Sequence, residues 1–250
     1  MNETLTIILG IAFIFLMTSL GALCVFFVNT TSKVLNIIVI GMASGIMLSA
    51  SIFSLILPAL EYGEGFMKIL PVVAGIILGG LFMVLITFLT RKIENRGNLS
   101  KPIRLFSAVT VHNIPEGLAV GFAFGMALIS SSTSALSSAM FVAIGIGLQN
   151  FPEGLAVSLP IYAQTKSKKK GFLFGFLSGV VEPIFAILGL FLATSISSLM
   201  PWLLSFSAGA MIFVVIEELL PELQEFKKGT LGTWSFLIGF LLMMILDVML

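Results

Sequence analysis

The chain has 250 residues, of which 58% are hydrophobic and only 10% are charged, and its formal net charge is +1. A soluble domain uses about 25% charged residues to cover its core, so this composition excludes a soluble enzyme, a nucleic-acid binder and a disordered protein. The single cysteine, Cys24, excludes an internal disulfide and a cysteine-based metal site, and the single histidine, His112, excludes a histidine-rich active site.

Eight runs of mostly apolar residues are each long enough to cross a membrane, which takes about 20 residues in a helix. They lack the period-two alternation of a membrane β-strand, so we expect an all-α polytopic membrane protein with a single transmembrane domain, residues 1–250. Gly-x-x-x-Gly patterns at 41–45 and 75–79 predict close helix packing. The expected helices are approximately 5–28, 34–60, 69–89, 103–129, 139–162, 172–193, 199–220 and 233–250.

The basic residues are sorted to one side of this predicted bundle. Only Lys68 lies on the side of the two termini, whereas twelve of the thirteen Lys and Arg residues fall in the first, third, fifth and seventh loops. Because basic loops stay in the cytoplasm, we expect both termini outside. The twelve are Lys33, Arg91, Lys92, Arg96, Lys101, Arg104, Lys166, Lys168, Lys169, Lys170, Lys227 and Lys228.

The acidic residues behave differently, because half of them lie inside the predicted spans. An ionised carboxylate at the centre of a membrane helix costs about 2.5–3.5 kcal/mol on insertion scales. No Lys or Arg lies in the central part of any span to pair with them, so they must be protonated, hydrated or bound to a cation. The six are Glu116, Glu153, Glu182, Glu217, Glu218 and Asp247.

One motif occurs twice, in the fourth and fifth predicted helices. Residues 112–120 and 149–157 match at seven of nine positions, 37 residues apart. Residues three and four apart share a helix face, and both motifs lie near mid-bilayer, so their polar side chains should converge. Imidazole and carboxylate ligands together suit Zn²⁺, Fe²⁺, Mn²⁺ or Co²⁺. The candidate ligands are His112, Asn113, Glu116, Gln149, Asn150 and Glu153.

The remaining acidic residues mark a path on either side of this level. Glu182 is near the middle of its predicted span, beside Pro183, and offers a third carboxylate. Glu217 and Glu218 lie toward the cytoplasmic end, where they predict a gate or exit, and Asp247 lies toward the outer end, where it predicts an entrance.

From these residues alone, three functions stay open. A divalent-metal transporter explains the stacked His, Asn and Glu side chains on two facing helices. A proton- or sodium-coupled transporter of an organic solute would also use intramembrane carboxylates. An intramembrane hydrolase would use a metal-bound water, but it favours patterns such as His-Glu-x-x-His, which this chain lacks. We therefore expect no catalytic residue and no catalytic cofactor.

At these motifs the sequence resembles the ZIP (Zrt/Irt-like) divalent-metal transporters, most of all the prokaryotic GufA-like branch. The resemblance implies a 3+2+3 inverted-repeat bundle, metal uptake toward the cytoplasm, an elevator motion and a homodimer. It also implies the plasma (inner) membrane of a prokaryote, with no nucleic-acid partner. The segments that carry it are His112–Gly117, Gln149–Gly154, Ser178–Pro183, Glu217–Pro221 and Gly45–Ala50.

The resemblance further implies a binuclear site between the fourth and fifth helices. Relatives often carry His in place of Gln149 and Asp in place of Asn150, so the second site is less negative here. Zinc is the first expectation for the transported ion, with cadmium, iron and manganese as alternatives. The first site would use His112, Glu116, Gln149 and Glu153 with Met47 near it, and the second Asn113, Asn150 and Glu182, with Glu116 and Glu153 bridging.

Overall fold

The computed structural model describes residues 3–28, 33–97, 101–195, 197–225 and 230–249, and every regular element in these ranges is helical. The α-helices are α1 (Glu3–Leu23), α2 (Lys33–Ala50), α3 (Leu57–Ala59), α4 (Phe66–Gly97), α5 (Lys101–Ser130), α6 (Thr133–Thr165), α7 (Lys168–Gly179), α8 (Val181–Ser195), α9 (Met200–Val214), α10 (Leu220–Glu225) and α11 (Leu231–Met249).

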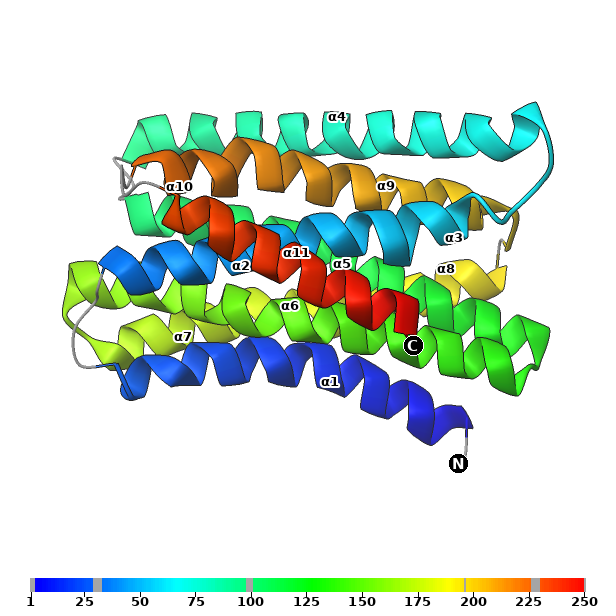
Figure 1. The fold of residues 1–250 in the computed structure, drawn as a ribbon, viewed down its shortest axis with the longest axis horizontal. Coiled ribbons are helices and arrows are strands. Elements are labelled where there is room, and N and C mark those ends of the chain that lie inside the picture. The colour runs from blue at the N-terminus through cyan, green and yellow to red at the C-terminus, as the bar shows by residue number, and fades with distance from the viewer. Residues whose placement is uncertain (1–2, 29–32, 98–100, 196, 226–229, 250) are drawn as a thin grey trace.

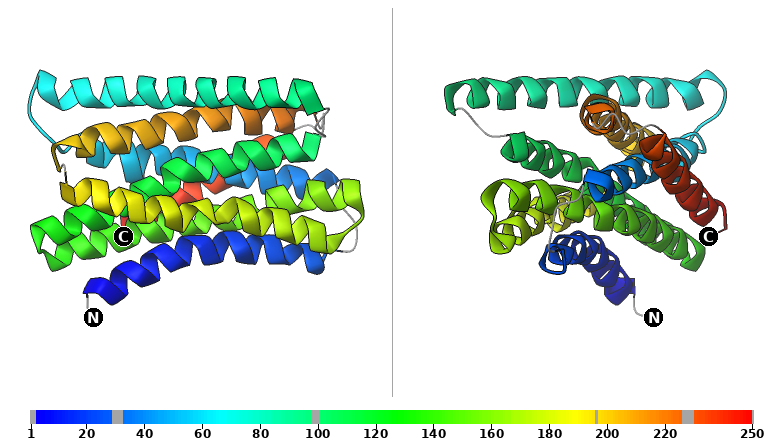
Figure 2. Two further views of the ribbon diagram at one scale, coloured as in Figure 1. Left: turned by 180° about the vertical axis from the view of Figure 1, so that it is seen from behind. Right: turned by 60° about the vertical axis from the view of Figure 1, so that its left-hand side comes forward.

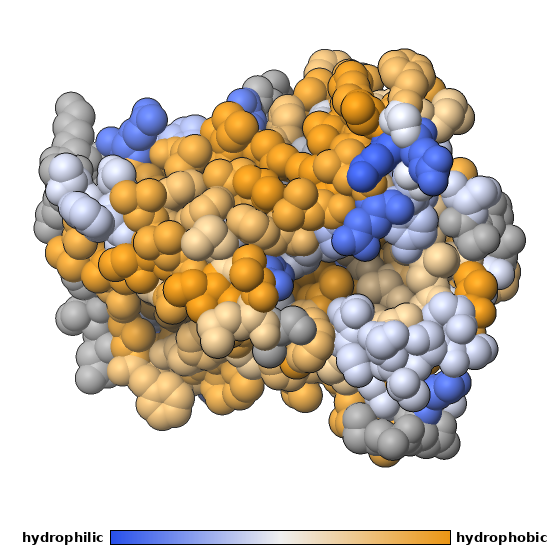
Figure 3. All heavy atoms as spheres, turned by 45° about the vertical axis from the view of Figure 1, so that its right-hand side comes forward, coloured by the Kyte–Doolittle hydropathy of each residue, from blue (hydrophilic) through white to orange (hydrophobic). Residues whose placement is uncertain are grey.

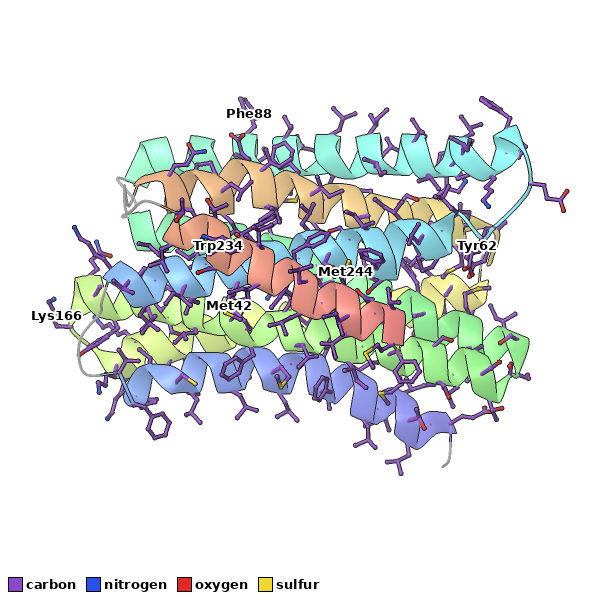
Figure 4. The ribbon with its side chains drawn as sticks, in the orientation of Figure 1. Met42, Tyr62, Phe88, Lys166, Trp234 and Met244 are labelled. Carbon is purple, nitrogen blue, oxygen red and sulfur yellow. The ribbon has the colours of Figure 1, made fainter. Side chains whose placement is uncertain are left out.

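The described residues contain eight helical segments long and apolar enough to cross a membrane, which confirms the predicted fold class. They run side by side along the long axis of the molecule, and both chain ends lie at the same end of the bundle (Figures 1 and 2). We call this the terminal end and the opposite one the basic end. Figure 4 shows Lys166 at the basic end and Tyr62 toward the terminal end, as the charge pattern predicts.

The sixth span is broken, although the sequence predicted one continuous helix over residues 172–193. Helix α7 ends at Gly179 and α8 begins at Val181. Pro183 has no backbone N–H and cannot bond to the carbonyl of Gly179, so the helical ladder is interrupted there. As a result Glu182 lies in the first turn of α8, where the helix dipole stabilises a carboxylate.

Two other spans contain a π-helical segment that the sequence did not predict. One covers Ser51–Ile56, between α2 and α3, and the other covers Val215–Leu219, between α9 and α10. Each precedes a proline, Pro58 or Pro221, which leaves an upstream carbonyl without its helical partner. Wide turns of this kind concentrate at functional sites, and these two contain Ser54 and the Glu217–Glu218 pair.

The spans pack as two groups. The first helix group consists of α1, α5, α6, α7 and α8, which contact one another. The second helix group consists of α2, which packs on α11, and α4, which packs on α9. A Cβ atom on Gly45 would collide with the carbonyl of Phe236 in α11, and one on Gly79 with the carbonyl of Phe206 in α9. Both Gly-x-x-x-Gly patterns are therefore sites of close helix packing, as predicted.

Helix α4 presents an apolar surface that no described part of the chain covers. Its large side chains at Ile77, Leu81 and Phe88 are 56%, 58% and 62% exposed. Figure 4 shows Phe88 pointing away from the bundle. An apolar surface of this extent is unstable in water but matches the hydrocarbon of a bilayer.

Candidate metal centre

The centre lies where α5, α6 and α8 meet inside the first helix group. Six of the eight candidate ligands named from the sequence have buried polar side chains there, each at most 3% exposed. Met47 is also buried, on α2, which packs against α6. The side chain of His112 lies outside the described residues. The six buried side chains are Asn113, Glu116, Gln149, Asn150, Glu153 and Glu182.

The glycine of each motif copy lets two helix backbones touch at this level. A Cβ atom on Gly117 of α5 would collide with the carbonyl of Glu182 in α8. A Cβ atom on Gly154 of α6 would collide with the carbonyl of Thr18 in α1. These approaches bring α8 and α1 close enough for their polar side chains to reach the motif residues.

A hydrogen bond joins the two motif copies. Gln149 donates from Nε2 to Oε1 of Glu116 over 2.7 Å. With its donor used in this way, the amide of Gln149 presents its Oε1 atom, which is buried and has no hydrogen-bond partner. The second carboxylate oxygen of Glu116, Oε2, is likewise buried and without a partner.

A second set of hydrogen bonds fixes Asn113 and Glu182. Asn113 donates from Nδ2 to the carbonyl of Ser178 over 3.0 Å and to Oε1 of Glu182 over 3.1 Å. The Ser178 carbonyl is among the last of α7, where helical partners run out. Thr18 donates to the same Glu182 oxygen over 2.5 Å. These bonds leave Oδ1 of Asn113 and Oε2 of Glu182 buried without a partner.

The centre therefore holds buried oxygen atoms that no donor satisfies. Native proteins rarely leave such atoms unpaired, because each costs about 1–3 kcal/mol of desolvation. Carboxylate and amide oxygens are hard ligands for a divalent cation, which would satisfy several of them at once. Five such oxygens are Asn113 Oδ1, Glu116 Oε2, Gln149 Oε1, Asn150 Oδ1 and Glu182 Oε2.

The carboxylates alone do not make this site. Glu116 interacts electrostatically with both Glu153 and Glu182. Even so, among the described residues no three His, Cys, Asp or Glu side chains are placed to hold a metal ion. Among the described side chains, the amide oxygens are therefore the atoms that could complete a ligand set with the carboxylates. A cation here would also offset the repulsion among the three carboxylates.

A separate cavity opens toward the terminal end. Its volume is about 580 Å³, and its lining includes Ser54, Glu61, Tyr62 and Met200. A smaller adjoining cavity contains Asp247, which accepts a hydrogen bond from Ser54 over 2.5 Å. Figure 3, with this end turned forward, shows a hollow rimmed by hydrophilic residues. We call the two cavities together the outer cavity, and none of the buried candidate ligands is among its lining residues.

The two acidic residues predicted near an exit lie at the other end of the bundle. Glu217 and Glu218 belong to the π-helical segment Val215–Leu219, with Glu217 exposed and Glu218 partly buried. Their place toward the basic end agrees with the sequence prediction. Their role as a gate remains a prediction.

Two polar residues of these sites were not identified from the sequence, namely Thr18 and Ser54. Hydroxyl residues in membrane helices commonly bond to the carbonyl four residues earlier, as Ser44 and Ser158 do here. Because this bond within the same helix is so common, the sequence does not reveal a hydroxyl group that bonds to a different helix. The sequence indicates these two residues only weakly, as polar residues within apolar runs whose other residues pack or face lipid.

Comparison with known proteins points the same way as this geometry. Residues 94–247 match the family described as ZIP Zinc transporter. The human zinc transporter ZIP11 is 32% identical, with 96% of each chain covered. The zinc transporter GufA of Myxococcus xanthus is 34% identical over 92% of this chain and 93% of its own. Zinc transporter ZupT of Streptococcus mutans is 32% identical over 91% of each. The chain belongs to the ZIP zinc transporter family.

Proposed function

We propose that this chain carries a divalent transition-metal ion, zinc before cadmium, iron or manganese, into the cytoplasm through the centre formed by α5, α6 and α8. As a ZIP transporter it is not an enzyme, and the metal is its substrate. The observation that supports the site most strongly is the set of buried, unpartnered oxygens between these helices. The relatives whose names specify zinc support the choice of ion.

The direction of transport is the one that the family resemblance implies, and the charge pattern supplies the orientation of the chain in the membrane. With the basic end in the cytoplasm, the ion enters from outside through the outer cavity, past Glu61 and Asp247. It leaves past Glu217 and Glu218. In between, the first site consists of His112, Glu116, Gln149 and Glu153, beside Met47. The second consists of Asn113, Asn150 and Glu182, and it shares Glu116 and Glu153.

An ion needs helix movement to complete this path, since the lining of the outer cavity includes none of the buried ligands. The packing supports sliding of one helix group against the other. The glycine contacts between backbones of different helices, such as Gly117 with Glu182 and Gly45 with Phe236, lie within a group. Between the groups, the glycine contact at Gly145 is with a flexible side-chain end, Cε of Met243. This arrangement favours an elevator-like motion.

The surroundings follow from the same features. The chain is a multi-pass integral membrane protein whose apolar outer faces contact lipid. Relatives from Myxococcus xanthus and Streptococcus mutans favour the plasma membrane of a prokaryote. A homodimer is the state that the family resemblance implies, and native mass spectrometry from detergent tests it.

Uptake of radioactive zinc into liposomes containing the purified protein tests the site. Glu116→Gln and Glu153→Gln each remove one carboxylate charge from the centre, and each should lower initial uptake at least about tenfold. Glu64→Gln removes the same charge from an exposed loop and should leave uptake unchanged. Full uptake by both centre variants would exclude this site.

A further inference from the structure

We propose that Thr18 of α1 is a positioning residue for Glu182, and that its hydroxyl group sets how tightly the centre holds the metal ion. The proposal rests on the transport function and the site proposed above. It assigns a role to the first span, which contributes none of the ligands expected from the motifs.

The hydroxyl of Thr18 has one proton and two acceptors within reach. The carbonyl of Ile14, its own helical neighbour, lies 3.3 Å away. Oε1 of Glu182 lies 2.5 Å away. Hydroxyl-to-carboxylate hydrogen bonds are typically about 2.5–2.7 Å long and about twice as strong as neutral ones. Both residues are fully buried, so no water competes, and the proton is donated to Glu182.

The surrounding helices are shaped to permit this contact. A Cβ atom on Gly179 would lie 2.9 Å from both Cβ and Cγ2 of Thr18, and 3.3 Å from Oε1 of Glu182. A larger residue there would push the two side chains apart. On the other side, Gly154 of the second motif copy lies directly against the carbonyl of Thr18. Gly154 of α6 and Gly179 of α7 thus allow α1 to lie within hydrogen-bonding distance of Glu182.

As a consequence, the two carboxylate oxygens of Glu182 have different surroundings. Oε1 accepts from Thr18 and from Asn113, whereas Oε2 has no hydrogen-bond partner. Two donors on Oε1 restrain rotation of the carboxylate, so that Oε2 stays available to a cation. Without the hydroxyl, Oε1 keeps the Asn113 amide as its donor and the carboxylate is held less firmly. Loss of such an outer hydrogen bond typically lowers metal affinity about 10–100-fold.

Replacement of the hydroxyl by a methyl group of similar shape is the direct test. In Thr18→Val, we expect the KM for zinc uptake into liposomes to rise about tenfold, with the maximal rate within about twofold of the original. The dissociation constant for radioactive zinc, measured by equilibrium dialysis of the purified protein, should rise by the same factor. Thr18→Ser restores the hydroxyl and should restore both values. Thr18→Ala serves if the valine variant does not fold.

A double variant separates a positioning role from a packing role. If Thr18 acts through Glu182, Thr18→Val should change zinc binding little in a protein that already carries Glu182→Gln. Unchanged affinity in folded Thr18→Val, or equal damage in Thr18→Ser, would overturn the proposal. Full uptake by Glu116→Gln would instead contradict the proposed site itself, so the two failures are distinguishable.

Discussion

Gln149 of α6 donates a 2.7 Å hydrogen bond to Glu116 of α5, so the two motif copies are joined through a position at which their sequences differ. The equivalent position of the first copy is His112. An amide can donate from its nitrogen and still present an oxygen, and Oε1 of Gln149 is buried without a hydrogen-bond partner. The position at which the copies differ therefore supplies the hydrogen bond between them.

Removal of this amide should weaken metal binding. Gln149→Leu keeps the approximate volume but deletes both the donor to Glu116 and one unpartnered oxygen. We expect the KM for zinc uptake to rise at least about tenfold, measured in liposomes with radioactive zinc. Gln164→Leu, in the same helix but near its basic end, is the matched control. Equal KM values for the two variants would show that Gln149 has no part in binding.

Adjacent glycines in α4 should respond differently to alanine. A Cβ atom on Gly79 would collide with the backbone of α9, whereas one on Gly80 would meet nothing within 4 Å. Overpacking of this kind costs about 1–3 kcal/mol, so Gly79→Ala should lower the free energy of unfolding by that amount. Gly80→Ala should leave it unchanged or slightly raised. Denaturant unfolding in detergent micelles measures both, and equal stability would contradict the α4–α9 packing.

The outer cavity should matter most when metal is scarce. Asp247→Asn removes its charge while keeping the shape of the side chain that bonds to Ser54. Because a charged vestibule concentrates cations, we expect the KM for zinc to rise about threefold at low ionic strength, and the difference to shrink in high salt. The dissociation constant for zinc at the centre, measured on the purified protein, should not change. A salt-independent effect, or none, would show that Asp247 does not attract the ion.

Tyr62, outside the membrane spans, should titrate late. Burial raises the pKa of its phenol above the ordinary value of about 10, and the neighbouring charge of Glu61 raises that pKa further. Tyr162→Phe leaves Tyr62 as the one remaining tyrosine, and ultraviolet absorbance then reports its ionisation. Adding Glu61→Gln should lower the pKa. The neutral phenol of Tyr62 therefore contributes to the stability of the folded protein at pH values below its ordinary pKa. This contribution is lost as the pH rises through the raised pKa. Titration at the ordinary pKa would contradict this placement.

Much of the fold could be predicted from the sequence, because membrane spans follow from apolar length and loop charge. The spans, their order and the shared side of the two termini depend on local composition. The repeated motif likewise predicted five of the six buried candidate ligands, because spacing along a helix determines which side chains share a face. The sixth, Glu182, was predicted from its position near the middle of an apolar span.

The remaining features depend on contacts that are distant in sequence. The break before Val181 comes from the missing N–H of Pro183, which interrupts the helix inside a long apolar run that by itself indicates one continuous helix. The π-helical segment Ser51–Ile56 has no composition that distinguishes it from an α-helix. The bond from Thr18 to Glu182 joins residues 164 positions apart, so no local pattern contains it.

The most direct test of the account is the position of the ion itself. Crystals of the protein soaked in zinc should give an anomalous scattering peak between α5, α6 and α8, within bonding distance of Glu116 and Glu182 oxygens. The same soak of Glu116→Gln crystals should give a weaker peak or none. A strong peak only in the outer cavity or beside Glu217 and Glu218, with no density at the centre, would contradict the central claim.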